Sequence, residues 1–302
     1  MKPKDLFLLV ILAAIWGSSY LFIRIAAPVM GSIFSMGLRV FLAAAALLIY
    51  GLTARQMPDF KTYRWRFLLL GALNNAIPFV LIANSVSELN ASIASTLNST
   101  TPLFTAVVAV LWAGERFTAR KVAGLVLGVI GVAVLMGWNS IPLSGRVILA
   151  GGEALVAALA YGLAAVYVRT QFKGVSPLHT SIGQLSGSTL LLAPLAAFNL
   201  PAAVPEIGPL AAVVVLALVC TVLAYLLYFR LITSAGATKA TSVTFLIPLF
   251  SVLWGVLFLK EPLSAGLVGG LVVILVSVWL VLGDRAAERV PAALKPALPR
   301  QG

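Results

Sequence analysis

The chain has 302 residues, of which 61% are apolar and only 10% are charged. Soluble proteins carry roughly 25% charged residues, and a soluble domain of this length could not bury so much apolar surface in one core. The composition therefore excludes a soluble globular protein and indicates a helical membrane protein. A single cysteine (Cys220) and a single histidine (His179) exclude an internal disulfide and the common zinc sites.

Ten apolar segments follow one another along the chain, and each is long enough to cross a bilayer as a helix. The first follows Lys2 and Lys4 but lacks a convincing cleavage site, so we expect a retained span rather than a secretory signal. We predict an all-α integral membrane protein with ten transmembrane helices, followed by a disordered cytoplasmic tail at 284–302. The expected spans are 6–27, 33–52, 67–87, 90–112, 119–137, 148–169, 178–198, 207–231, 236–258 and 264–282.

The net charge of +12 is divided into short clusters between the apolar segments, which is typical of topology signals rather than of a nucleic-acid-binding face. Only Arg24, Arg146 and Lys260 fall on one side of the predicted membrane, and 17 Lys and Arg residues fall on the other. The positive-inside rule then places both termini in the cytoplasm. We expect the protein in the inner (plasma) membrane of the cell. The 17 residues are Lys2, Lys4, Arg55, Lys61, Arg64, Arg66, Arg116, Arg120, Lys121, Arg169, Lys173, Arg230, Lys239, Arg285, Arg289, Lys295 and Arg300.

The second half of the chain repeats the first. Pro102–Thr105 aligns with Pro248–Ser251 at an offset of 146 residues, and Trp16-Gly17 aligns with Tyr161-Gly162 at an offset of 145. The alignment predicts one five-helix repeat at residues 1–140 and another at 141–283. Because five is odd, the second repeat enters the membrane inverted, and inverted repeats with a binding site between them are typical of secondary transporters.

A family resemblance rests on several of these features. They are Trp16-Gly17-Ser18 in the first span, Arg39 in the second, the Pro-Leu-Phe…Glu pattern at Pro102–Glu115 and Pro248–Glu261, and glycine-rich fifth and tenth spans. The sequence resembles the drug/metabolite transporter superfamily, in particular its EamA-type ten-helix exporters, and is most similar to YddG-type exporters of aromatic amino acids. The resemblance implies export of small molecules and says little about the substrate. Packing of the glycine-rich spans inside one chain favours a monomer or a weak dimer.

Polar and aromatic side chains inside the spans are the candidate substrate-binding residues. Amides and hydroxyls are costly in lipid unless they are satisfied, and aromatic rings can stack on an aromatic or amphipathic substrate. Ordinary interhelical hydrogen bonding and placement in an interfacial belt are the alternatives. The candidates are Trp16, Ser19, Tyr20, Asn74, Asn75, Pro78, Asn98, Thr101, Tyr161, Tyr225, Thr244 and Phe245.

Two prolines, Pro102 and Pro248, are expected near the middle of equivalent spans. A proline inside a helix removes one backbone hydrogen bond and bends the helix. We predict that both act as hinges of a moving helix pair, with a static kink as the alternative.

The predicted spans contain few charges. Arg39 stands alone in an uncharged run from Ile25 to Ala54 and calls for a partner, for which Glu88 and Glu153 are the available acids. One of these carboxylates could couple transport to protons, although both could instead be solvated at the membrane surface. Glu115 and Glu261, which end the fourth and ninth spans, are expected to shape helix-turn-helix junctions.

The predicted function is secondary active export of small amphipathic metabolites, with aromatic amino acids favoured, by alternating access. A carrier for other neutral or cationic metabolites or drugs is the alternative within this class. An intramembrane enzyme is the alternative from another class, but no span brings a Ser–His pair or an aspartate. No cofactor and no metal site are expected, and the partners are the bilayer, the substrate and a coupling proton.

Reporter fusions test the topology. Fusions at positions 60, 118, 173 and 295 should be cytoplasmic, and fusions at positions 89, 142 and 204 should be external, because the Lys and Arg clusters alternate in this way. A single exchanged site would show a miscounted span, and inversion of all seven would contradict the orientation.

Overall fold

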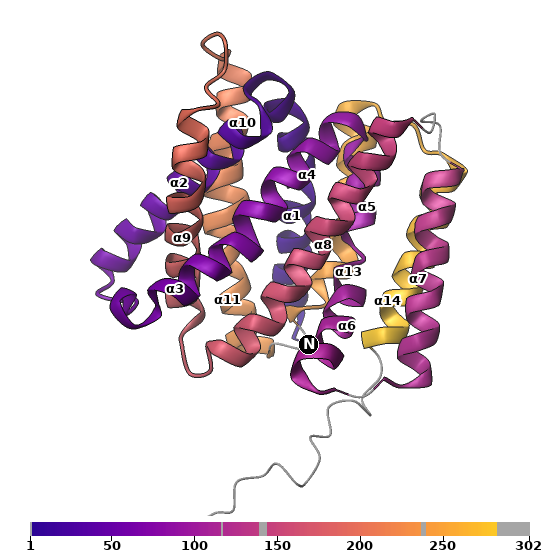
Figure 1. The fold of residues 1–302 in the computed structure, drawn as a ribbon, viewed down its shortest axis with the longest axis horizontal. Helices are drawn as coiled ribbons and strands as arrows, with labels where there is room; N and C mark the ends of the chain where they lie inside the picture. The colour runs from indigo at the N-terminus through magenta and orange to yellow at the C-terminus, as the bar shows by residue number, and fades with distance from the viewer. Residues whose placement is uncertain (1, 116, 139–143, 237–239, 283–302) are drawn as a thin grey trace, which may run out of the picture.

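A computed structural model describes residues 2–115, 117–138, 144–236 and 240–282, and these residues form helices without a strand (Figure 1). The first half contains α1 (Pro3–Met30), α2 (Ser32–Thr53), α3 (Phe60–Gly71), η1 (Ala72–Ala76), α4 (Ile77–Glu88), α5 (Ala91–Asn98), α6 (Thr101–Ala113) and α7 (Ala119–Gly137). The second half contains α8 (Gly145–Gln171), α9 (Pro177–Ala197), α10 (Ile207–Ala217), η2 (Leu218–Leu223), α11 (Ala224–Ala235), α13 (Val243–Leu259) and α14 (Ala265–Leu282).

The described helices support a multi-pass membrane protein. Eight helical segments are long and apolar enough to cross a bilayer, and α13 is a shorter apolar helix of 17 residues. Helix α9 occupies the predicted seventh span but is not among these eight; it carries polar residues such as Thr180, Gln184 and Ser188 along its length. The count of ten spans stays a prediction, and the predicted tail at 284–302 lies outside the described residues.

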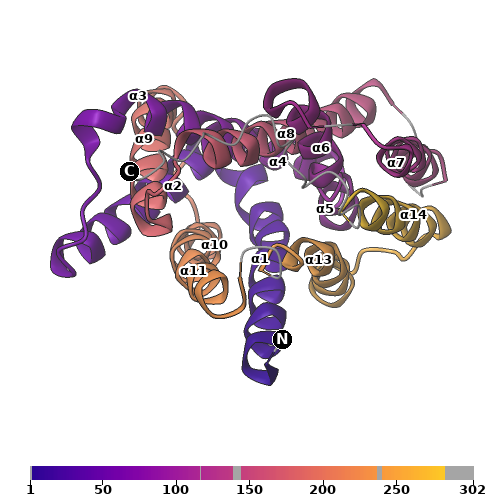
Figure 2. The ribbon, with the colours of Figure 1, turned by 90° about the horizontal axis from the view of Figure 1, so that it is seen from below.

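Helix α1 runs through the centre of the molecule, between α10 and α11 on one side and α13 on the other (Figure 2). Helices α2, α3 and α9 pack together at one end, and α7 and α14 pair at the opposite end (Figures 1 and 2). The α7–α14 pair depends on glycine. A Cβ atom at Gly124 would lie 2.9 Å from the Ser277 carbonyl oxygen, and one at Gly270 would lie 2.6 Å from Leu135 Cβ. These glycines therefore pack inside the chain.

One π-helical turn interrupts a span in each half. The turns η1 and η2 begin at Ala72 and Leu218, which are 146 residues apart, so they occupy equivalent positions in the two repeats. A π-turn inserts an extra residue into the helix and redirects the side chains around it, and such turns are frequent at functional sites. Asn74 and Asn75 lie on η1, and Cys220 and Thr221 lie on η2.

The fourth predicted span is broken at Pro102 instead of bent there. Helix α5 ends at Asn98 and α6 begins at Thr101, so Pro102 lies in the first turn of a new helix. Its ring obstructs continuation from α5, while its missing N–H costs little in the first turn of α6. The interruption at Ser99 and Thr100 lies inside the span Ala91–Ala113, and the hinge role of Pro102 stays a prediction.

Three consecutive hydroxyls donate to carbonyls of the preceding turn, and one of these carbonyls, that of Asn98, has no N–H from Pro102 to accept. Ser99 Oγ donates to the Thr96 carbonyl at 2.6 Å, and Thr100 Oγ1 donates to the Leu97 carbonyl at 2.6 Å. Thr101 Oγ1 donates to the Asn98 carbonyl at 2.7 Å. The serine and threonine run before Pro102 thus stabilises the break. Pro248, by contrast, lies inside α13, so the two aligned prolines have different places in their helices.

The two halves contact each other at aligned glycines. A Cβ atom at Gly17 on α1 would lie 2.7 Å from Phe250 Cβ on α13, and one at Gly162 on α8 would lie 2.9 Å from the Thr105 nitrogen on α6. In each case the first helix of one half packs against a late helix of the other half. A side chain at either position would force the two helices apart.

Replacing Gly162 by valine tests this close contact. We expect Gly162→Val to destabilise the protein by about 1–3 kcal/mol, because an added side chain overpacks a site closed by backbone. Gly152→Val on the same helix is the matched control, since a Cβ atom at Gly152 meets no atom within 4 Å. Thermal unfolding of the two purified variants in detergent is the measurement, and equal transition temperatures would contradict the expectation.

Candidate functional site

Arg39 is the centre of a buried polar cluster. It lies on α2 with 4% of its surface exposed. Its Nε donates to Thr221 Oγ1 on η2 at 3.1 Å, and its guanidinium carbon lies 3.9 Å from the centre of the Phe79 ring. Thr221 Oγ1 in turn donates to the Leu216 carbonyl at 2.8 Å, which fixes the hydroxyl as an acceptor for the arginine. The π-turn η2 thus supplies the hydrogen-bond partner of Arg39.

The predicted acidic partners of Arg39 are elsewhere. Glu88 is exposed at the end of α4, and Glu153 Oε1 accepts a hydrogen bond from Asn84 Nδ2 at 3.1 Å. Among the described residues, ion pairs are formed only by Glu115, with Lys121 and Arg169. Neither of the two available acids pairs with Arg39 in the described part of the chain, because α2 places Arg39 beside η2 and the ring of Phe79.

A second polar pair mirrors the first. Gln184 on α9 aligns with Arg39 at an offset of 145 residues, and its Oε1 accepts a hydrogen bond from Asn74 Nδ2 on η1 at 2.9 Å. In each half, therefore, the second span reaches the π-turn of the other half. Gln184 was not a candidate from sequence, although its alignment with Arg39 was a signal that could have identified it.

Several predicted residues gather around Arg39. Asn98 Nδ2 donates to Tyr20 Oη at 2.9 Å, and Tyr225 Oη donates to Asn75 Oδ1 at 3.2 Å. Tyr20, Tyr161 and Tyr225 all lie within electrostatic range of the Arg39 guanidinium. Five of the twelve candidates therefore meet at one place. Beside them, Cys220 Sγ lies 3.7 Å from Ser18 Oγ and also close to Ser19.

Two of these tyrosines are only partly buried. Tyr161 and Tyr225 keep some accessible surface beside the cluster. Two amide atoms, Asn75 Nδ2 and Asn98 Oδ1, are also buried without a hydrogen-bond partner among the described residues, and such atoms call for an explanation such as a bound molecule.

The remaining predicted residues have local or packing contacts. The Trp16 ring lies 5.4 Å from the Tyr228 ring, in a different apolar cluster. Thr244 Oγ1 donates to the Thr241 carbonyl at 2.9 Å, Phe245 packs against the apolar cluster that includes Leu103 and Val278, and Pro78 is buried in α4. Their assignment to the substrate pathway stays a prediction.

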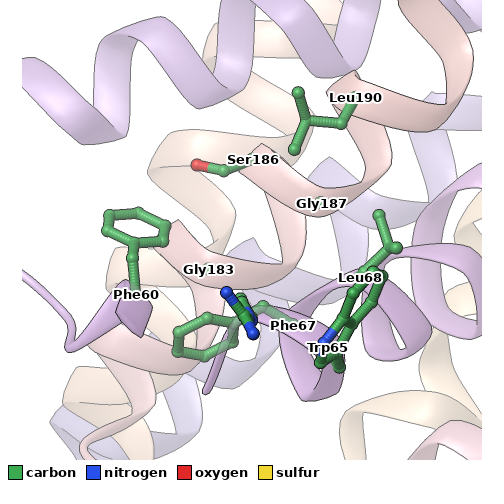
Figure 3. Close-up of a pocket in the computed structure, with 9 residues that line it drawn as sticks. Phe60, Trp65, Phe67, Leu68, Gly183, Ser186, Gly187 and Leu190 are labelled. Atoms are coloured by element: carbon green, nitrogen blue, oxygen red, sulfur yellow. The ribbon is translucent and has the colours of Figure 1, made fainter. Parts of the chain in front are cut away.

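A separate apolar groove of about 330 Å³ lies between α3 and α9. Figure 3 shows aromatic side chains of α3 facing the stretch of α9 around Gly183 and Gly187. None of the predicted site residues lines it. The lining residues are Phe60, Arg64, Trp65, Phe67, Leu68, Gly183, Ser186, Gly187 and Leu190.

The Glu261 carboxylate caps the N-terminus of α5. Its carboxylate accepts hydrogen bonds from the Ala91 N–H at 2.7 Å, from the Ser92 N–H at 3.1 Å and from Ser92 Oγ. Gly255 leaves the room for this contact, since a Cβ atom there would meet both Glu261 and Ser92 Oγ. A carboxylate at a helix N-terminus satisfies free N–H groups and complements the helix dipole. Glu261 therefore joins two helices, in addition to its predicted role at a junction.

Glu115, the aligned glutamate, has different partners. Its carboxylate lies 3.0 Å from Lys121 Nζ and 2.8 Å from an Arg169 nitrogen, and Lys121 is nearly fully buried. Burial disfavours the charge, but the hydrogen bonds from Lys121 and Arg169 outweigh it and hold the pKa of Glu115 below its ordinary value. The ion pairs thus fix α8 to the α6–α7 junction.

Comparisons with known proteins agree on one family of transporters. The profile described as the EamA-like transporter family matches residues 4–137 and 149–283. The chain is 29% identical to the uncharacterized transporter YvbV of Bacillus subtilis, over 96% of this chain and 95% of that protein. It is 26% identical to protein PecM of Dickeya dadantii over 89% of each chain. One solved crystal structure of a protein has a TM-score of 0.63 at 19% identity, covering 93% of this chain and 98% of the other, and it shows the likeness of fold.

Glu115→Gln tests the ion pairs at the α6–α7 junction. We expect a loss of about 1–2 kcal/mol at neutral pH, since nearly buried Lys121 would keep its charge without a carboxylate. Because the folded pKa of Glu115 is lowered, its contribution is present above the ordinary glutamate pKa of about 4.3 and is lost as the pH falls through the lowered value.

Thermal unfolding of wild type and Glu115→Gln between pH 2 and 7 is the measurement. The difference in transition temperature should be largest at neutral pH and should shrink on acidification. Glu88→Gln is the control, because Glu88 is exposed and outside the ion pairs of the described residues. A difference that stays constant with pH would contradict this account.

Proposed function

The chain belongs to the EamA-like transporter family, and we propose that it is a secondary active exporter of small amphipathic metabolites, chiefly aromatic amino acids. That it is a membrane transporter rather than an enzyme follows from the family and from relatives named as transporters. The substrate class, the direction and the mechanism are the proposal.

The observation that carries the substrate class is the cluster around Arg39. Three tyrosines, two amides and one arginine lie near one another, and they come from both halves of the chain. Tyrosine rings offer apolar faces with a polar tip, and amides offer donors and acceptors. Such a lining suits a solute with an aromatic body and a polar head.

Alternating access is the mechanism that the arrangement supports best. The two halves hold each other through equivalent contacts, at Arg39–Thr221 and at Asn74–Gln184, so small shifts between the halves would open or close the space between them. The break at Pro102 is a place where a helix can bend cheaply, and we assign a hinge role to it and to Pro248. Protons, taken up by Glu153 or Glu88, are the coupling ion in this proposal, and the protein works in the inner membrane as a monomer or weak dimer with cytoplasmic termini.

Counterflow in proteoliposomes tests the proposed function. The purified protein should exchange labelled phenylalanine, tyrosine and tryptophan, faster with a pH gradient than without it, and should not exchange sugar phosphates. Tyr161→Ala should lower exchange by roughly tenfold, because one aromatic contact is worth up to about 1.5 kcal/mol beyond its buried area.

Tyr50→Ala is the matched control, since Tyr50 is exposed at the far end of α2. It should leave exchange unchanged. Exchange of sugar phosphates without aromatic amino acids would reject the proposal, and exchange of neutral or cationic drugs alone would favour the other substrate class within the family.

A further inference from the structure

Arg39 carries a buried positive charge without a countercharge. Its hydrogen-bond partner is the neutral hydroxyl of Thr221, and its other neighbours are the Phe79 ring, the Cys220 thiol and three tyrosines. Among the described residues no carboxylate pairs with it. An isolated buried charge is costly, and proteins normally offset it with an opposite charge. We infer that the missing countercharge is supplied by an anion that the protein binds.

The guanidinium is also left with free donors. Arginine has five N–H groups, and the hydrogen bond to Thr221 uses only the one on Nε. The two Nη groups make no hydrogen bond within the described part of the chain. Neither is among the side-chain atoms that are fully buried without a hydrogen-bond partner. Each therefore keeps some accessible surface, and Tyr161 and Tyr225, which also keep some, lie within electrostatic range of the guanidinium.

The remaining contacts orient these donors. Thr221 holds Nε, and the Phe79 ring covers one face of the guanidinium plane at 3.9 Å. A guanidinium fixed in this way presents its two Nη groups side by side, which matches the two oxygens of a carboxylate. A phosphate would carry more negative charge than one arginine can offset, so a single carboxylate is the better match.

We propose that Arg39 binds the carboxylate of the transported molecule through its two Nη groups, and that the protein therefore selects apolar solutes that carry a carboxylate. This inference rests on the proposed function and narrows it: amino acids and aromatic carboxylic acids are accepted, and amines without a carboxylate are rejected by the charge of Arg39. Asn98 Oδ1, a buried acceptor without a partner, is placed near Tyr20 to receive the ammonium group of an amino acid.

Matched solutes that differ in one group test the proposal. Proteoliposomes with purified wild type are given labelled phenylalanine, 3-phenylpropionate and phenethylamine, together with leucine and its amine analogue, isopentylamine. We expect exchange of the carboxylates and at least tenfold slower exchange of both amines. Arg39→Gln should lower exchange of the carboxylates by at least roughly 30-fold, the usual cost of removing one member of a buried charge pair.

Two further variants separate binding from folding. Arg39→Lys keeps the charge but loses the paired donors, so it should retain part of the carboxylate exchange and still reject amines. Arg64→Gln removes an exposed arginine of α3 and should leave all rates unchanged. The transition temperature and the elution volume of every variant show whether it is folded. If Arg39→Gln is misfolded, Arg39→Lys takes its place in the comparison.

The outcomes distinguish the two proposals. Exchange of leucine but not of aromatic amino acids, with rejection of isopentylamine, would reject the aromatic substrate and support the carboxylate site. Equal exchange of phenylalanine and phenethylamine by wild type, a folded Arg39→Gln with an unchanged preference for carboxylates, or a folded Arg39→Lys with undiminished carboxylate exchange would overturn the carboxylate site and leave the aromatic substrate in place. Exchange of none of these solutes would overturn both.

Discussion

Backbone groups inside a bilayer cannot bond to water, so each departure from a regular helix needs a substitute donor or acceptor. The described chain departs at η1, at η2 and between α5 and α6, and polar side chains stand at each of these places. Thr101 donates to the Asn98 carbonyl, which Pro102 leaves without an N–H donor, and Thr221 donates to the Leu216 carbonyl. The same residue types that make the irregular backbone possible also supply the polar groups of the candidate site.

The site lies where the halves meet because its members are shared between them. Arg39 of the first half bonds to Thr221 of the second, and Asn74 of the first half bonds to Gln184 of the second. Close packing at Gly17 and Gly162 brings the surrounding helices of the two halves together. Each half therefore completes the polar groups of the other, and neither could form the cluster alone.

The two halves are alike in sequence but differ in detail. Helices α6 and α13 both end in a residue with positive φ, Gly114 and Lys260, followed by a glutamate whose N–H bonds back to the preceding turn. Yet Glu261 caps α5, whereas Glu115 pairs with Lys121 and Arg169. Aligned residues thus have unequal side-chain partners although the backbone around them is alike.

The sequence by itself determined what depends on local composition. Apolar runs predicted the helices, as at 119–137, which matches α7 residue for residue, and the alignment of the halves paired Gly17 with Gly162 without predicting their contacts. Five of twelve candidate residues meet at Arg39, because polar and aromatic residues inside spans are few and stand out.

Only the tertiary structure decided which residues are partners. The bond from Arg39 to Thr221 spans 182 residues, and the bonds from α5 to Glu261 span about 170. Such contacts depend on how the helices pack against one another. The spacing of residues along the chain does not predict this packing. The break at Pro102 was also decided there, because the same proline fits a kink or a first turn and the neighbouring helices select between them.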